Sequence, residues 1–89
     1  MHQMEEYEVA QQNSKQLKVL FYLNQLNQYW KRYDHLERGP TSLSKEECEE
    51  EKRVACICYQ YAEVQLAALG YHYSQLKYDR DTLTYSLPD

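Results

Sequence analysis

The sequence predicts an all-α fold, an antiparallel two-helix hairpin that dimerises into a four-helix bundle. Two long segments carry apolar residues at steps of three and four, as amphipathic helices do. A Gly-Pro pair separates the two segments, and the second has more apolar surface than one partner helix can bury. We expect one domain over residues 1–89, with helices at about 5–38 and 45–80, a turn at 39–44 and an extended tail at 81–89.

The first expected helix has no proline or glycine between Glu5 and Arg38. Asn13 and Ser14 could instead cap a shorter helix, and this alternative stays open. The main apolar stripe of this segment is Val19, Leu23, Leu26, Trp30 and Tyr33, with further apolar residues such as Leu17, Leu20 and Phe21 beside it.

The turn is marked by Gly39 and Pro40. Glycine adopts the left-handed conformation common at helix ends, and proline cannot continue the helical hydrogen-bond ladder. Ser44 with Glu47 three residues later predicts a capping box, so the second helix should begin at Lys45. The acids that follow sit where the helix dipole is positive and form an acidic patch: Glu46, Glu47, Glu49, Glu50 and Glu51.

The second expected helix has two apolar stripes. A connection of about six residues makes the helices antiparallel neighbours, with facing residue numbers that add up to roughly 83, so that Arg32 faces Glu51. The expected hairpin seam is Leu26, Trp30, Ala62, Leu66, Leu69 and Tyr73. The second stripe is the expected dimer or partner interface: Val54, Ile57, Tyr61, Val64, Ala68 and Tyr71. Gly70 inside this helix would cost about 1 kcal/mol relative to alanine, or mark a bend. In the tail, Tyr85 and Leu87 can fold back onto the helices.

No residue pattern indicates catalysis, a metal or a cofactor, and we expect none of these. Three cysteines without a secretory leader indicate free thiols. Cys56 and Cys58 point about 200° apart on a helix and cannot share one ion. His35 and Cys48 should lie near each other at the turn, but they lack the third group and the pocket of a nucleophilic site.

Composition narrows the function class. The net charge of −4 disfavours direct binding to nucleic acid, and no apolar run is long enough to span a membrane. The acidic N-terminal segment is unlike a secretory signal, which favours a cytoplasmic or nuclear protein. The chain has ten tyrosines and one phenylalanine. A tyrosine suits a half-buried surface, because its ring is apolar and its hydroxyl can stay in contact with water.

We therefore predict a non-enzymatic protein-interaction module that forms a homodimer and presents a tyrosine-rich surface to an unidentified protein partner, as an adaptor, inhibitor or assembly factor. One alternative is an acidic mimic of nucleic acid that uses the acidic patch. Another is a small-ligand binder with an aromatic pocket between subunits, lined by Trp30, Tyr59 and Tyr73.

Overall fold

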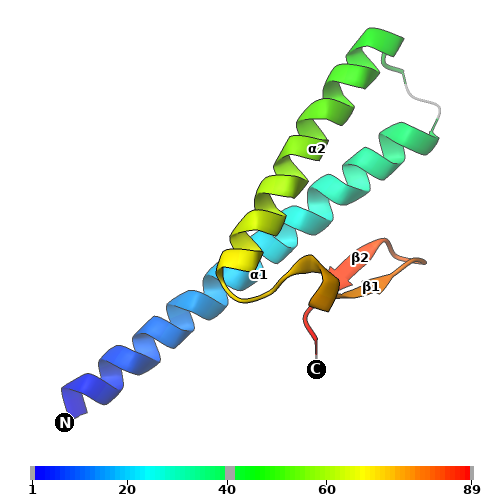
Figure 1. Cartoon of the computed structure of the whole chain (residues 1–89). Helices are drawn as coiled ribbons and strands as arrows, with labels where there is room; N and C mark the ends of the chain where they lie inside the picture. Colours follow the sequence, from blue (N-terminus) through cyan, green and yellow to red (C-terminus); the bar gives the residue numbers. More distant parts are fainter. Residues whose placement is uncertain (1, 40–41, 89) are drawn as a thin grey trace.

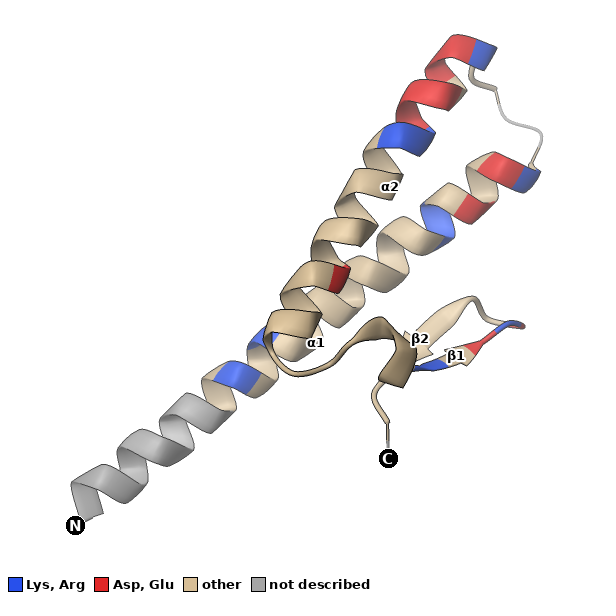
Figure 2. Cartoon of the chain, viewed as in Figure 1, with Lys and Arg blue, Asp and Glu red and all other residues tan. Residues whose placement is uncertain are grey.

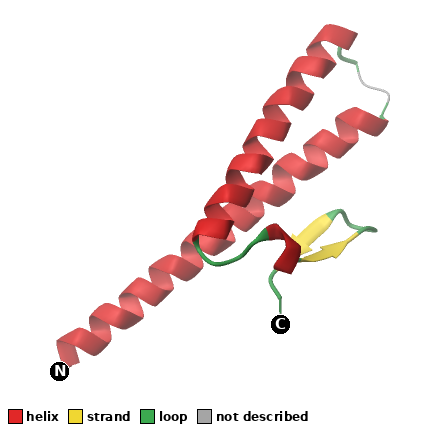
Figure 3. Cartoon of the chain, in the orientation of Figure 1, coloured by secondary structure: helices red, strands yellow, loops and turns green. Residues whose placement is uncertain are grey.

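The computed structural model describes the backbone of residues 2–39 and 42–88 and the side chains of 13–39 and 42–88. Its elements are helix α1 (His2–Arg38), helix α2 (Lys45–Ala68), a 3₁₀ helix η1 (Tyr73–Gln75) and strands β1 (Lys77–Asp79) and β2 (Thr84–Ser86). Helices α1 and α2 form an antiparallel hairpin, with the strands at its side (Figure 1). The helical hairpin is confirmed. The all-helical prediction is wrong for the last residues, because the chain ends in a two-stranded sheet (Figure 3).

Helix α1 ends at Arg38, at the expected boundary. The Gly39 amide still donates to the His35 carbonyl at 2.9 Å. The expected left-handed conformation of Gly39 is wrong, since among the described glycines only Gly70 has a positive φ. A Cβ atom at Gly39 would lie 2.9 Å from the His35 carbonyl oxygen, so close approach is the reason for glycine here. Residues 40 and 41 of the expected turn lie outside the described residues.

Helix α2 begins at Lys45 with Ser44 as its N-cap, as predicted. The Ser44 hydroxyl oxygen accepts from the Glu47 amide at 3.2 Å and donates to the Glu47 carboxylate at 3.1 Å. A cap of this kind stabilises a helix by about 1 kcal/mol. The first turn of α2 is therefore anchored at the position that the sequence indicates.

Helix α2 ends at Ala68, so the expected extension to residue 80 is wrong. Gly70 has φ 99°, which reverses the chain. The Gly70 amide donates to the Ala67 carbonyl at 3.0 Å, and the Tyr71 amide donates to the Leu66 carbonyl at 2.8 Å. These two bonds are those of a Schellman motif, the usual C-terminal cap with a glycine. Gly70 is thus a helix terminator, and it does not lie in a helix interior.

The expected extended tail is a β-hairpin followed by a short end segment. Strands β1 and β2 are antiparallel, with Tyr78 opposite Tyr85. At the turn, the Asp79 carboxylate accepts from the Asp81 amide at 2.9 Å. Leu83 completes the turn with φ 54°, a left-handed conformation that is uncommon for a leucine.

The β-hairpin is fixed to α1 by the side chain of Asn27. Its amide nitrogen donates to the Tyr85 carbonyl at 2.9 Å, and its oxygen accepts from the Tyr85 amide at 2.6 Å. Tyr85 and Leu87 pack on the core, which confirms that the tail folds back. The core cluster combines residues from α1, from α2 and from the end of η1: Val19, Leu26, Ala62, Leu66 and Leu76.

Candidate functional site

The hairpin seam follows the predicted register. Arg32 and Glu51, whose numbers add up to 83, form an ion pair at 3.2 Å. Among the expected seam residues, Leu26, Ala62 and Leu66 are buried, and Leu69 and Trp30 are half-buried. Tyr73 is wrongly placed in that prediction, because it belongs to η1 beyond the end of α2 and is exposed.

Four of the six residues of the expected interface form an exposed apolar row on α2. The exposed fraction of each lies between 46% and 62%: Val54, Ile57, Tyr61 and Val64. Ala68, the last residue of α2, is exposed as well. Tyr71 does not belong to the row, because it follows the Schellman turn and packs against the core.

The row faces away from the β-hairpin. Tyr59 points to the hairpin side, where its ring contacts Trp30 at 5.4 Å, edge to face. Ile57 and Tyr61 each lie two residues from Tyr59, and residues two apart on a helix point about 200° apart. The β-hairpin therefore covers one side of the helical hairpin and leaves the side with the row uncovered.

Aromatic residues of α1 continue the row across the seam. The Tyr22 ring lies 6.2 Å from the Tyr61 ring and 5.2 Å from the Phe21 ring, both in edge-to-face contact. Loss of hydration and the nearby Tyr61 raise the pKa of Tyr22, so this phenol stays neutral. Phe21 is 57% exposed. We call the combined surface the open face: Phe21, Tyr22, Val54, Ile57, Tyr61 and Val64.

A hollow of about 320 Å³ lies beside Val54 on the open face. Its lining comes from both helices and is partly polar: Gln28, Tyr29, Arg32, Glu51, Val54 and Ala55. The Arg32–Glu51 ion pair therefore lies at the rim of a site large enough for a bulky side chain.

The acidic patch lies at the turn end of the hairpin (Figure 2). Three of its five carboxylates form ion pairs with cations of the same chain: Glu49 with Lys52 at 3.1 Å, Glu50 with Arg53 at 3.2 Å and Glu51 with Arg32 at 3.2 Å. Lys52 also bridges to Glu37 of α1 at 3.1 Å. Hydrogen bonds to these two glutamates raise the pKa of Lys52, which stays charged. The patch thus joins the helices at their turn end.

The aromatic residues expected to line a ligand pocket pack within one chain. Trp30 donates from Nε1 to the Tyr78 hydroxyl at 2.8 Å, and its ring contacts Tyr59 and Tyr85. The hydrogen bond with the Cys56 thiol at 3.5 Å is the main cause of a raised pKa of Tyr59, and partial burial of the phenol raises it further. Trp30 and Tyr59 are thus in contact within one chain, and the ring contacts of the described residues include none between Tyr73 and either of them. A ligand pocket between two subunits stays a prediction.

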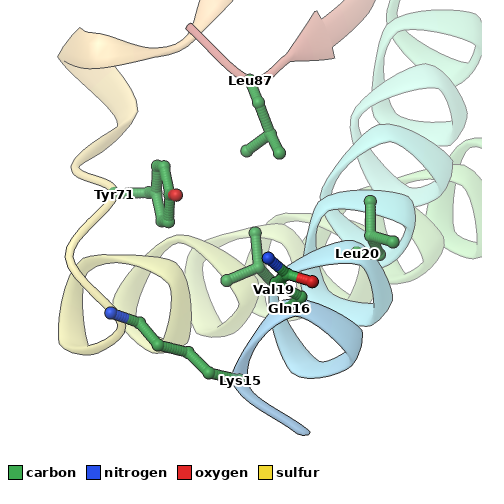
Figure 4. A pocket seen from close by; sticks show the side chains of 6 residues that line it. All are labelled: Lys15, Gln16, Val19, Leu20, Tyr71 and Leu87. Atoms are coloured by element: carbon green, nitrogen blue, oxygen red, sulfur yellow. The ribbon is translucent and has the colours of Figure 1, made fainter. Parts of the chain in front are cut away.

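A larger hollow of about 520 Å³ lies near the chain reversal, between α1 and the tail. In Figure 4, Tyr71 and Leu87 lie on one side of it, and Gln16, Val19 and Leu20 lie on the other. Among the described residues that line it, Lys15 is the one that carries a charge. Within the described residues, no group of three or more His, Cys, Asp or Glu side chains converges as metal ligands would.

The described part of the chain contains no helix that is both long and apolar enough to cross a membrane. The chain matches no protein-family model, no curated protein and no solved structure. The open face is therefore the candidate site on its own geometry. The interface residues predicted from the sequence all come from the second helix, and Phe21 and Tyr22 of α1 were not among them although they lie beside the main apolar stripe of that helix.

Proposed function

We propose that the protein is a small, non-enzymatic protein-interaction module that acts by burying the open face against another protein chain. The observation that carries the proposal is the continuous apolar surface over two packed helices. Burying a valine, isoleucine or aromatic side chain contributes about 1.5–3 kcal/mol, so this face is a large source of binding free energy. Exposed apolar patches of this kind are typical of interaction sites.

The architecture behind the face supports a docking role. Leu26, Ala62 and Leu66 are almost fully buried under it, and this packing holds the two helices together, with Arg32 and Glu51 paired at the surface. A preformed surface loses little conformational entropy on binding. The tyrosines add polar hydroxyls at the edge of an apolar ring, which suits a rim that is partly hydrated.

The mimicry alternative has less support from the geometry. Intrachain ion pairs of Glu49, Glu50 and Glu51 neutralise much of the local negative field. A mimic of nucleic acid needs carboxylates that are not paired with cations of its own chain, because its affinity comes from the attraction of those carboxylates to a basic groove.

The test is capture from the native host with three tagged baits. The first is the wild-type chain, the second carries Ile57→Glu and Val64→Glu, and the third carries Thr82→Glu in the β-hairpin turn as the control. We expect the wild-type and control baits to retain a chain, including untagged copies of this protein, that the double variant loses. Retention should change little between about 50 and 500 mM salt, because apolar burial is not screened. Equal capture by all three baits, with circular dichroism showing that each is folded, would refute the proposal.

A further inference from the structure

We propose that the crossover between α2 and β1, residues 69–76, is a pH-sensitive joint in which the imidazole of His72 exchanges partners when it is protonated. The neutral ring holds η1 by hydrogen bonds, and the protonated ring pairs with the Glu63 carboxylate of α2. Both ends of the crossover are fixed, since Tyr71 packs against the core and Leu76 is 8% exposed. The residues between them are exposed, so His72 is open to protons from the solvent. The crossover connects α2 to the β-hairpin (Figure 1), so a change in it alters that connection.

The neutral state depends on Nδ1 of His72 as a hydrogen-bond acceptor. The Ser74 amide donates to this nitrogen at 3.3 Å, and the Ser74 hydroxyl oxygen lies 2.8 Å from it. In return, the Gln75 side-chain oxygen accepts from the His72 amide at 3.1 Å, so the two side chains form a capping box on η1. An imidazole nitrogen accepts only when it carries no proton. The bond from the Ser74 amide therefore requires the tautomer with its proton on Nε2.

Protonation of His72 removes this acceptor. Both nitrogens of a charged imidazole are donors, so the Ser74 amide loses its partner. The positive charge then lies next to N–H groups at the start of η1, which is unfavourable. The Ser74 hydroxyl can still accept from the charged ring, but the bond to the backbone is lost. Imidazoles change their charge between about pH 5 and 8, so mild acid is enough to weaken η1.

The charged ring has a second partner in Glu63. This carboxyl group is half-buried and lies one turn after Tyr59 on the hairpin side of α2. Burial raises the pKa of Glu63, and the charge of His72 lowers it, so the two groups are close enough to attract each other. Among the charges of the described residues, His72 is the one that acts on this carboxyl group.

Two phenols complete the surroundings of this pair. The Tyr73 ring lies 4.6 Å from the imidazole, and Tyr85 of β2 faces Glu63. Burial, followed by the charges of Tyr78 and Glu63, raises the pKa of Tyr85. A phenol whose pKa is raised above about 10 keeps its proton in mild acid, so Tyr85 does not take part in the exchange. Mild acid therefore opens η1 and loosens the tie between α2 and the β-hairpin.

The experiment uses NMR on the purified full chain, and its first measurement is the tautomer of neutral His72. The ¹⁵N shifts of the two ring nitrogens, recorded at about pH 8, distinguish the tautomers. We expect the proton on Nε2. A proton on Nδ1 would overturn the proposal, because the Ser74 amide would then have no acceptor on the ring.

The second measurement is amide hydrogen exchange at about pH 7.5 and about pH 5.5, expressed as protection relative to the unfolded chain. The Gln75 amide reports on η1 because it donates to the His72 carbonyl at 2.8 Å, and the Leu76 amide does so through its bond to Tyr73 at 3.1 Å. Their protection should fall about fivefold in acid, as expected for the loss of a cap. The Tyr71 amide should keep its protection. An equal loss at Tyr71, or no loss at Gln75 and Leu76, would overturn the joint.

Three variants assign the effect to the two groups. His72→Asn keeps a capping acceptor that does not titrate, so its protection should be the same at both pH values. His35→Asn, at an exposed position of α1, is the matched control and should retain the wild-type loss. Glu63→Gln removes the second partner, so the loss should occur at lower pH than in the wild type. A wild-type loss in His72→Asn would overturn the role of His72, and an unchanged midpoint in Glu63→Gln would overturn the exchange of partners.

Discussion

Replacement of Asn27 by alanine should detach the β-hairpin from α1 and leave the helical hairpin folded. Asn27 makes two hydrogen bonds to the Tyr85 backbone, at 2.9 and 2.6 Å, in a half-buried position. Each such bond contributes a net of about 0.5–1.5 kcal/mol. Losing both should lower the free energy of local opening by about 2 kcal/mol, which corresponds to about 30-fold faster exchange of the Tyr85 amide.

The assay is native-state amide hydrogen exchange followed by NMR. Asn24→Ala is the matched control, because Asn24 is exposed on the same helix and has the same gain in helix propensity. Asn27→Asp has nearly the shape of asparagine but no donor for the Tyr85 carbonyl, so it should not restore full protection. The reasoning is refuted if Tyr85 in Asn27→Ala exchanges at the wild-type rate, or if amides of α2 lose protection equally.

Three further predictions concern the core, the chain reversal and pH. Leu26 is 0% exposed, so Leu26→Ala should cost about 2–5 kcal/mol in denaturant unfolding, whereas Leu20→Ala, at an exposed position, should cost much less. A Cβ atom at Gly70 would have no atom within 4 Å, so Gly70→Ala should cost only the strain of the left-handed backbone, about 1–2 kcal/mol. This cost should appear as a lower Tm, and an unchanged Tm would contradict the prediction. Burial raises the pKa of Glu63 by more than the charge of His72 lowers it. The folded chain therefore binds the proton of the Glu63 carboxyl more tightly than the unfolded chain does. The stability contributed by Glu63 is full below its ordinary pKa and is lost as pH rises through the raised value. Glu63→Gln should therefore stabilise the protein at pH 7 and make little difference near roughly pH 4, and the opposite trend in urea unfolding would refute the assignment.

Local signals were enough to predict the helical hairpin. The Gly39 stop and the Ser44 cap mark helix boundaries within a few residues, and the short turn then dictates which residues face each other. The Arg32–Glu51 ion pair appears in the register that this geometry requires. The exposed row of α2 follows from the same argument, since one neighbouring helix cannot cover two stripes.

The end of α2 could not be predicted from periodicity. Apolar residues continue at steps of three and four past Gly70 to Leu76, so the pattern is the same whether the chain stays helical or reverses. The helix ends because Gly70 adopts a left-handed conformation and two hydrogen bonds cap the last turn. The sequence around Gly70 is equally compatible with a bent helix that continues. Strands of three residues are too short to show alternation. The Asn27–Tyr85 contact joins residues 58 positions apart and leaves no local trace.

The double hydrogen bond of Asn27 has a consequence for solubility. Strand edges with free amides and carbonyls are templates on which other chains can add strands and aggregate. On the outer edge of β2, the amide and the carbonyl of Tyr85 are both occupied by one side chain, which takes the place of a third strand. The other edge, β1, is only three residues long and carries Lys77 and Asp79, which are charged. This small sheet is thus shielded from edge-to-edge growth on both sides, and one asparagine on a helix provides half of that shielding.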